Sequence, residues 1–144
     1  MPATISERPF STGANSAGEQ IRQEHTFQRV AVIGLGYVGL PLAMEFARAG
    51  HTVIGLEVDE SKVRSLLRKE SYIPDVPGEE LARYVDTGVL TASTDFDVLA
   101  EVDAIVIAVP TPLRKTRDPD VSYIVAAAEE VRKRLRKGQL VVLE

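Results

Sequence analysis

A glycine pattern placed between an apolar run and an amphipathic stretch constrains the fold of this chain most. The segment GLGYVG at residues 34–39 has the spacing G-x-G-x-x-G, follows an apolar run at 30–33 and precedes helical periodicity. A lone match is weak evidence, but a strand-to-helix context makes it typical of a turn that binds a dinucleotide pyrophosphate. Gly34 would allow the tight turn, Gly36 the approach of a phosphate to the backbone, and Gly39 close packing of the helix on the sheet.

A helix that begins in this turn needs no lysine to attract an anion. Its first N–H groups are unpaired and its N-terminus carries a partial positive charge. The lysine of a P-loop is absent from the segment, which argues against that class of site. The alternative is that the three glycines serve only a tight turn, although such a turn does not require a glycine at all three positions.

Apolar runs alternate with amphipathic stretches along the rest of the chain. Runs at 30–33, 53–56, 104–109 and 140–143 show no polar alternation, so we expect four strands buried on both faces of a parallel sheet; a short strand could also occupy 90–92. Helices are expected at 38–49, 60–69, 78–84 and 95–100, and from 120 or 121 to 137, where Gly138 would stop the last one. This order predicts an α/β fold of Rossmann type, with helices on both faces of the sheet.

The apolar faces of the first two helices can be read from their spacing. Asp59 precedes the second helix and can cap it. We expect these faces to consist of Leu42, Phe46 and Ala49 in the first helix and of Val63, Leu66 and Leu67 in the second.

The last helix ends in a basic run at 132–137 that resembles a nucleic-acid patch. Cations at a helix C-terminus complement the partial negative charge there, and Glu129 and Glu130 lie just upstream. We therefore interpret the run as an ordinary helix end. The net charge of −4 likewise gives no reason to expect nucleic acid or an anionic membrane as partner.

Composition separates the chain into a leader and one domain. Residues 1–27 are rich in Ser, Thr, Gly, Pro and Gln without apolar periodicity, so we expect a disordered, flexible leader, followed by a single domain at 28–144. No apolar run is long enough to span a bilayer and no signal peptide is evident, which predicts a cytoplasmic protein without membrane contact. The absence of cysteine excludes disulfides, thiolate metal sites and a thiol nucleophile from the chain, and no metal site is expected.

Glu57 closes the second predicted strand, about 20 residues beyond the glycine turn, where a dinucleotide site places an acidic residue on the adenosine ribose. Asp59 is the alternative ribose ligand, but as a helix cap it already has a structural role. A carboxylate at this place repels the additional phosphate of NADP, so we expect NAD as the cofactor.

A second candidate site follows the strand predicted at 104–109. Pro110-Thr111-Pro112 forms a stiff turn that would present one hydroxyl and backbone groups at the carboxyl end of the strand. Ligands of open α/β sheets bind outside these strand ends. The alternative is a rigid exit loop without a role in binding.

Several ordered motifs resemble the UDP-glucose/GDP-mannose dehydrogenase family over about residues 29–144. They are AVIGLGYVGLPLA at 31–43, the acidic strand end at 53–59, SYIPD at 71–75, and AVPTPL at 108–113 followed by PDVSY at 119–123. The last two are most similar to the branch that acts on UDP-N-acetyl-hexosamines, the UDP-N-acetyl-D-glucosamine and -mannosamine 6-dehydrogenases.

The resemblance implies roles for particular residues. It implies NAD contacts by Gly34, Gly36, Tyr37, Val38 and Gly39 at the pyrophosphate, Glu57 at the ribose, Lys62 near the adenosine, and Val109, Pro110 and Thr111 along the cofactor, with Thr111 near the reacting end. Glu57 departs from the aspartate that is usual in the family, which can lengthen or shift the ribose contact.

The resemblance further implies an oxidoreductase for polysaccharide precursors that binds a UDP-sugar in a separate domain and forms a homodimer through a central helix. Such enzymes oxidise the sugar C6 alcohol to a carboxylate with two NAD molecules, through a thioester on a cysteine. Because the chain has no cysteine, we expect residues 1–144 to be an inactive fragment that holds the cofactor alone, without a catalytic residue. The alternatives are the NAD domain of another dehydrogenase, such as a hydroxy-acid or hydroxyacyl-CoA enzyme, and a non-catalytic nucleotide-sensing module.

Overall fold

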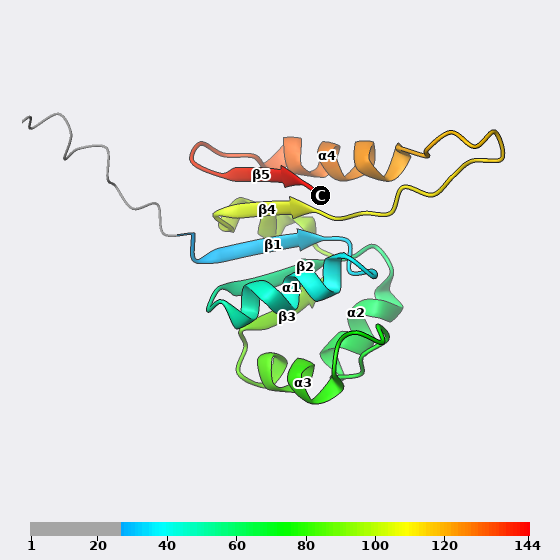
Figure 1. Ribbon diagram of the computed structural model, residues 1–144. Helices are drawn as coiled ribbons and strands as arrows, with labels where there is room; N and C mark the ends of the chain where they lie inside the picture. The colour runs from blue at the N-terminus through cyan, green and yellow to red at the C-terminus, as the bar shows by residue number, and fades with distance from the viewer. Residues whose placement is uncertain (1–26) are drawn as a thin grey trace, which may run out of the picture.

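The computed structural model describes residues 27–144, where five parallel strands form one sheet between two layers of helices (Figure 1). The predicted leader up to residue 26 lies outside the described residues, and Phe27, placed in the same leader, is half-buried against the core. The strands are β1 (Arg29–Ile33), β2 (Thr52–Leu56), β3 (Leu90–Ser93), β4 (Ala104–Ile107) and β5 (Leu140–Leu143). The helices are α1 (Gly39–Arg48), α2 (Glu60–Leu67), α3 (Gly78–Asp86), the 3-10 helix η1 (Phe96–Glu101) and α4 (Ser122–Arg134).

The strand order is β3-β2-β1-β4-β5, so the first strand of the chain lies in the middle of the sheet. Val30 pairs with Val53 of β2 on one side and with Ala104 of β4 on the other. The chain moves outward from β1 to β3 and then returns to the other side of β1. This reversal between β1 and β4 is the switch point where doubly wound sheets bind dinucleotides, and it confirms the Rossmann-type prediction.

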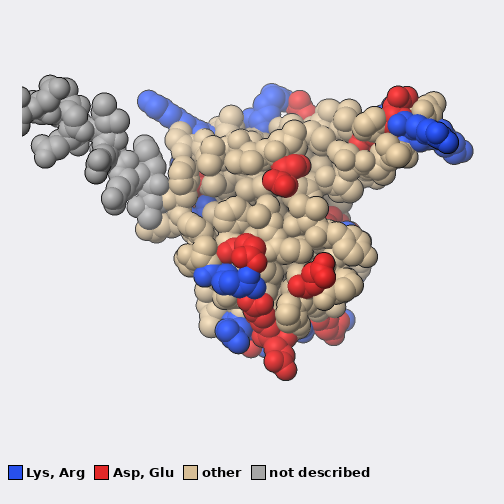
Figure 2. Space-filling model, in the orientation of Figure 1, with Lys and Arg blue, Asp and Glu red and all other residues tan. Residues whose placement is uncertain are grey.

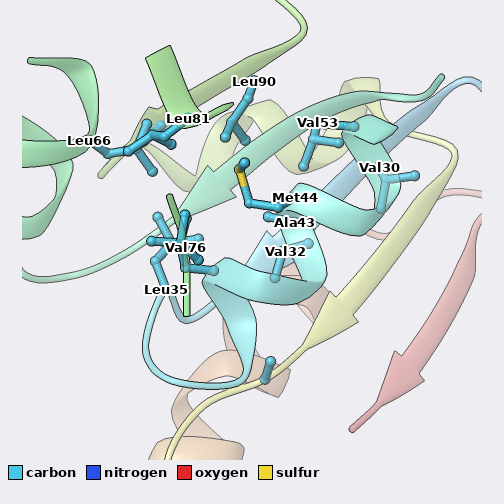
Figure 3. Packing of buried hydrophobic residues seen from close by; sticks show 14 of the residues in the cluster. Val30, Val32, Leu35, Ala43, Met44, Val53, Leu66, Val76, Leu81 and Leu90 are labelled. Atoms are coloured by element: carbon cyan, nitrogen blue, oxygen red, sulfur yellow. The ribbon is translucent and has the colours of Figure 1, made fainter. Parts of the chain in front are cut away.

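Two hydrophobic clusters pack on opposite faces of the sheet. On one face, α1, α2 and α3 cover alternate residues of the inner strands; Figure 3 shows Met44 of α1 among Val53, Leu66 and Leu90. On the other face, η1 and α4 cover Ile33, Ile105 and their neighbours. Because both faces are covered, β1 and β4 contain almost no polar side chain, as expected for a parallel sheet.

The buried face of α1 differs from the predicted one. Leu42 and Phe46 are only half-buried and Ala49 is exposed. The helix instead turns a row of small and apolar residues toward the sheet, which lets its backbone approach the strands closely: Gly39, Leu40, Ala43, Met44 and Ala47. In α2, Val63 and Leu66 are buried as predicted, whereas Leu67 is exposed.

Residues 140–143 form the predicted strand, but the prediction that this strand is buried is wrong. β5 exists and pairs with β4, but all four side chains are between 37% and 58% exposed. β5 lies at an edge of the sheet with one neighbouring strand, and neither hydrophobic cluster includes any of its residues. An apolar run therefore predicted the strand correctly without revealing where it lies.

The helix α4 ends at Arg134, three residues before the predicted end. Beyond it, Arg136 donates to the carbonyls of Ala100 and Val102, and the Gln139 amide donates to Leu99 and Val102. These bonds hold the chain against the end of η1 in a non-helical turn. The basic side chains upstream pair as expected with acidic ones: Arg132 with Glu129, Lys133 with Glu130, and Arg134 with Glu130 and Asp97.

The remaining elements agree with the prediction to within a few residues. β3 occupies the segment where a short strand was considered possible, η1 is a 3-10 helix rather than an α-helix, and β4 ends at Ile107 instead of residue 109. In residues 27–144, every helix is too short or too polar to cross a bilayer.

Candidate cofactor-binding site

A pocket of about 1140 Å³ opens at the edge of the sheet where the strands end. The turns that follow β1, β2, β3 and β4 line it together with α4, so its walls come from segments distant in the sequence. Its volume slightly exceeds the usual range for small-ligand pockets and suits an extended dinucleotide. Every binding residue predicted from the sequence except Gly39 lines this pocket: Gly34, Gly36, Tyr37, Val38, Glu57, Lys62, Val109, Pro110 and Thr111.

Gly34 makes the tight turn that leaves β1. Its φ of +94° lies in the region that favours glycine, and its N–H donates to the Leu56 carbonyl at 2.8 Å. A Cβ at Gly34 would approach the Ala108 carbonyl oxygen to 2.6 Å. The turn is therefore wedged between the ends of β2 and β4, and only a residue without a side chain fits there.

Gly36 and Gly39 differ in what surrounds them. A Cβ at Gly36 would meet nothing within 4 Å, so this position faces open pocket space. A Cβ at Gly39 would overlap the carbonyl oxygen of Gly34 and touch the Ala108 side chain at 3.5 Å. The close packing expected of Gly39 is thus chiefly with the turn itself, and only secondarily with the end of β4. Of these two glycines, only Gly36 has open space on the side where a Cβ would lie.

The Glu57 carboxylate joins the turns after β1 and β2. Its Oε2 accepts the Leu35 N–H at 3.1 Å, and its Oε1 accepts the N–H groups of Val58 and Asp59 at 2.9 and 3.3 Å. The residue is only 9% exposed. A buried carboxylate needs such partners, and the part of it that lines the pocket remains available to an incoming hydroxyl donor.

Lys62 and Asp59 flank this carboxylate. The Lys62 ammonium lies 3.6 Å from Glu57 Oε2, so the two charges form an ion pair at the pocket wall. Asp59 caps α2 as predicted, accepting the Ser61 N–H at 2.8 Å. The Ser61 hydroxyl and backbone N–H bonds lower the pKa of Asp59. The sequence left Glu57 and Asp59 as alternative ribose ligands, and in the structure Asp59 is the one engaged in capping.

Val109, Pro110 and Thr111 leave β4 on the opposite side of the glycine turn. Val109 is half-buried, whereas Pro110 and Thr111 are exposed at the pocket. Beyond them, residues 113–119 form a loop that projects from the body of the molecule (Figure 1), and Lys and Arg side chains stand at its tip (Figure 2). Arg114 pairs with Asp120, and hydrogen bonds from Ser122 and Arg114 lower the pKa of Asp120.

Several lining residues were missed by the sequence analysis. Phe96 and Asp97 follow β3, and Tyr123, Glu130 and Arg134 belong to α4. The Arg134 guanidinium donates to Asp97 at 2.8 Å, which ties α4 to the end of β3. The possible short strand at 90–92 could have indicated Phe96 and Asp97, because a parallel strand there ends at the same edge of the sheet as the others.

Tyr72 is a further residue of this region that the sequence analysis assigned no role. Its hydroxyl donates to the Leu35 carbonyl at 2.8 Å. Burial raises the pKa of Tyr72 well above its usual value, and the negative charges of Glu57 and Asp59 act in the same direction. The hydroxyl therefore stays protonated and keeps donating across the physiological pH range.

The arrangement suits the binding of a phosphate-linked ribose. Gly36 exposes backbone in the turn just before α1, near the helix N-terminus where the helix dipole stabilises an anion, and Glu57 provides a hydrogen-bond acceptor one strand away. The residues in place thus fit an NAD molecule with its pyrophosphate at the turn and a ribose at Glu57. The pocket walls offer binding groups but no cysteine nucleophile.

Comparisons with known proteins show which family the chain is similar to. Residues 28–144 match the family model of the UDP-glucose/GDP-mannose dehydrogenase family, NAD binding domain. A UDP-N-acetyl-D-mannosamine dehydrogenase from Salmonella typhi is 41% identical over 120 residues, which is 83% of this chain and 28% of the relative. An NDP-N-acetyl-D-galactosaminuronic acid dehydrogenase from Ralstonia nicotianae is 39% identical over 82% of this chain and 27% of its own length.

A solved structure shows the same similarity in three dimensions. The crystal structure of an NDP-N-acetyl-D-galactosaminuronic acid dehydrogenase from Methanosarcina mazei Go1 superposes with a TM-score of 0.78 at 30% identity. The match covers 88% of this chain and 29% of that protein. The chain therefore spans less than a third of the length of each of these relatives.

Proposed function

Because the chain belongs to the UDP-glucose/GDP-mannose dehydrogenase family and is its NAD-binding domain, we propose that the pocket at the sheet edge holds NAD as the oxidant for a nucleotide sugar. The observation that carries this proposal is the open face of Gly36 beside the Glu57 carboxylate, both in one pocket. The first suits a pyrophosphate and the second a ribose.

The proposed placement of NAD follows the turns. The pyrophosphate lies against Gly34, Gly36, Tyr37 and Val38, while Gly39 packs closely against the Gly34 carbonyl. The adenosine ribose donates to Glu57, and Lys62 lies nearby. The nicotinamide half extends along Val109, Pro110 and Thr111. Direct contacts at these residues are proposals, supported by their lining of one pocket.

The proposed reaction of the full-length protein is the oxidation of a UDP-sugar at C6, from alcohol to carboxylate, with two NAD molecules. The relatives named for N-acetyl-D-mannosamine and N-acetyl-D-galactosaminuronic acid support a UDP-N-acetyl-hexosamine as substrate. A product of this class would serve as a precursor for polysaccharide synthesis. The homodimer and the cytoplasmic location expected from the sequence stay predictions.

Residues 1–144 alone are expected to bind NAD without turnover. The thioester implied by the family resemblance needs a cysteine, and this chain contains none. NADH production by the purified chain with a panel of UDP-sugars, followed at 340 nm, would contradict this expectation.

A glycine substitution tests the proposed placement of NAD. A Cβ at Gly36 would meet nothing within 4 Å in the protein, so Gly36→Ala leaves the melting temperature nearly unchanged while its methyl group occupies space assigned to the pyrophosphate. We expect the Kd for NAD, measured by calorimetry, to rise by about tenfold or more, equivalent to about 1.4 kcal/mol. An unchanged Kd would contradict the placement.

The preference for NAD over NADP tests the role of Glu57. Because the Glu57 carboxylate repels the 2′-phosphate of NADP, we expect the wild-type chain to bind NAD more tightly than NADP. The ion pair with Lys62 reduces the size of this preference. In Glu57→Gln the gap between the two Kd values should narrow. Equal affinities in the wild type, or tighter binding of NADP, would overturn the assignment.

A further inference from the structure

Leu35, the residue between the first two glycines of the turn, is held at three points. Its N–H donates to Glu57 at 3.1 Å, its carbonyl accepts from the Tyr72 hydroxyl at 2.8 Å, and its side chain is fully buried. The side chain lies over Gly55, the penultimate residue of β2, where a Cβ would approach Leu35 Cδ1 to 2.7 Å. The turn is thus fixed by residues from β2, from the end of β2 and from the loop after α2.

The hydrogen bond from Tyr72 constrains the peptide unit between Leu35 and Gly36. The Leu35 carbonyl and the Gly36 N–H belong to one planar trans peptide, so the two groups point in opposite directions. Fixing the carbonyl on Tyr72 therefore fixes the direction of the Gly36 N–H. Among residues 27–144 that N–H has no hydrogen-bond acceptor, and Gly36 lines the pocket.

Tyr72 is itself held firmly by the loop that presents it. The Ser71 hydroxyl donates to the Ile73 carbonyl at 3.0 Å, and Ile73 and Val76 are buried in the hydrophobic cluster that also contains residues of α1. The phenol is half-buried and packs against the hydrophobic cluster that contains these two residues. The loop can thus hold the hydroxyl in one place while the glycine turn is free of ligand.

We propose that Tyr72 is a positioning residue for the cofactor, which aims the Gly36 N–H at the pyrophosphate by holding the Leu35 carbonyl. This inference rests on the proposed binding of NAD and extends it to a residue outside the glycine motif. Tyr72 touches the turn rather than the ligand. Its loss should weaken only those ligands that place a phosphate on the turn.

The test compares Tyr72→Phe with the wild-type chain for two ligands. NAD carries the pyrophosphate and adenosine does not, so we expect the Kd for NAD to rise about 3- to 10-fold while the Kd for adenosine, measured by NMR titration, stays within twofold. The Gly36 amide signal should also shift in the ligand-free variant, because the N–H loses its fixed direction.

Tyr84→Phe is the matched control, since Tyr84 is also half-buried and packs against the same hydrophobic cluster. It should leave both Kd values and the Gly36 signal unchanged. Equal weakening of NAD and adenosine in Tyr72→Phe, or an unchanged Kd for NAD, would overturn the role of Tyr72 and leave the proposed function standing. Failure of the wild-type chain to bind NAD would overturn both.

Discussion

β1 and β5 have similar apolar sequences and opposite surroundings. RVAVI in β1 is buried at every residue except the first, whereas LVVL in β5 is exposed throughout. β1 lies between two strands with helices on both faces, and β5 has a strand on one side only. The different burial of these two strands therefore follows from their surroundings, and the glycine turn follows a strand that is enclosed by strands on both sides and by helices on both faces.

The largest expected effect contrasts the turn after β1 with the turn before β5. In Gly39→Ala the new methyl group overlaps the Gly34 carbonyl, so we expect a loss of about 4 kcal/mol or more of unfolding free energy, together with NAD binding. Gly138→Ala meets no neighbouring atom, and its φ of +93° should cost about 1–2 kcal/mol. Urea unfolding of both variants gives the comparison, and similar losses would show that the turn after β1 is not specially crowded.

Truncating one side chain in each of the two strands should give the effect of intermediate size on stability. Ile33→Ala empties a site that is 3% exposed and should cost about 2–5 kcal/mol. Leu140→Ala removes a side chain that is 46% exposed and should change stability by about 0.5 kcal/mol. If thermal unfolding gives equal losses, β5 is covered in solution and the contrast between the strands does not hold.

The smallest expected effect concerns the acidic residue that joins β1 to β4. Asp103 accepts the N–H groups of Gln28 and Arg29, and the Arg29 bond is the main cause of its lowered pKa. A lowered pKa in the folded state stabilises the fold above the ordinary value of 3.8, and this contribution is lost as the pH falls through the folded value. The carboxyl is partly exposed, so the contribution is small.

Asp103→Asn should therefore lower the melting temperature slightly at pH 7, and the difference from wild type should vanish in acid, once the pH lies below the folded-state pKa of Asp103. Asp118→Asn in the projecting loop is the control, and its melting temperature should follow the wild type at every pH. A difference for Asp103→Asn that persists in acid would show that its charge is not the cause.

The sequence predicted the parts of the site that depend on local pattern. The glycine turn, the acidic end of β2 and the Pro110–Thr111 turn all line one pocket, because the carboxyl ends of parallel strands meet at one edge. Contacts between distant segments were less visible. No local pattern shows that Tyr72 bonds to Leu35, that Gly55 makes room for Leu35, or that Arg134 reaches Asp97.

The errors in the fold have the same cause. The exposed β5 and the incorrect face of α1 follow from the way in which elements pack. A helix that approaches the sheet through Gly39, Ala43 and Ala47 turns small side chains inward, and larger ones such as Phe46 then lie at the flank. Periodicity based on the largest apolar residues selects the wrong face in such a helix.

The central position of β1 also has a consequence for how the protein folds. β1 is synthesised first, yet the carboxylate that holds the Arg29 N–H lies 74 residues further along the chain. Every pairing in the sheet is parallel and needs a crossover, and such long-range contacts form slowly. During synthesis, the hydrogen-bonding edge of β1 that will pair with β4 stays unpaired until β4 has been synthesised. The strand that precedes the glycine turn therefore has an unpaired edge in the nascent chain, and unpaired strand edges favour aggregation.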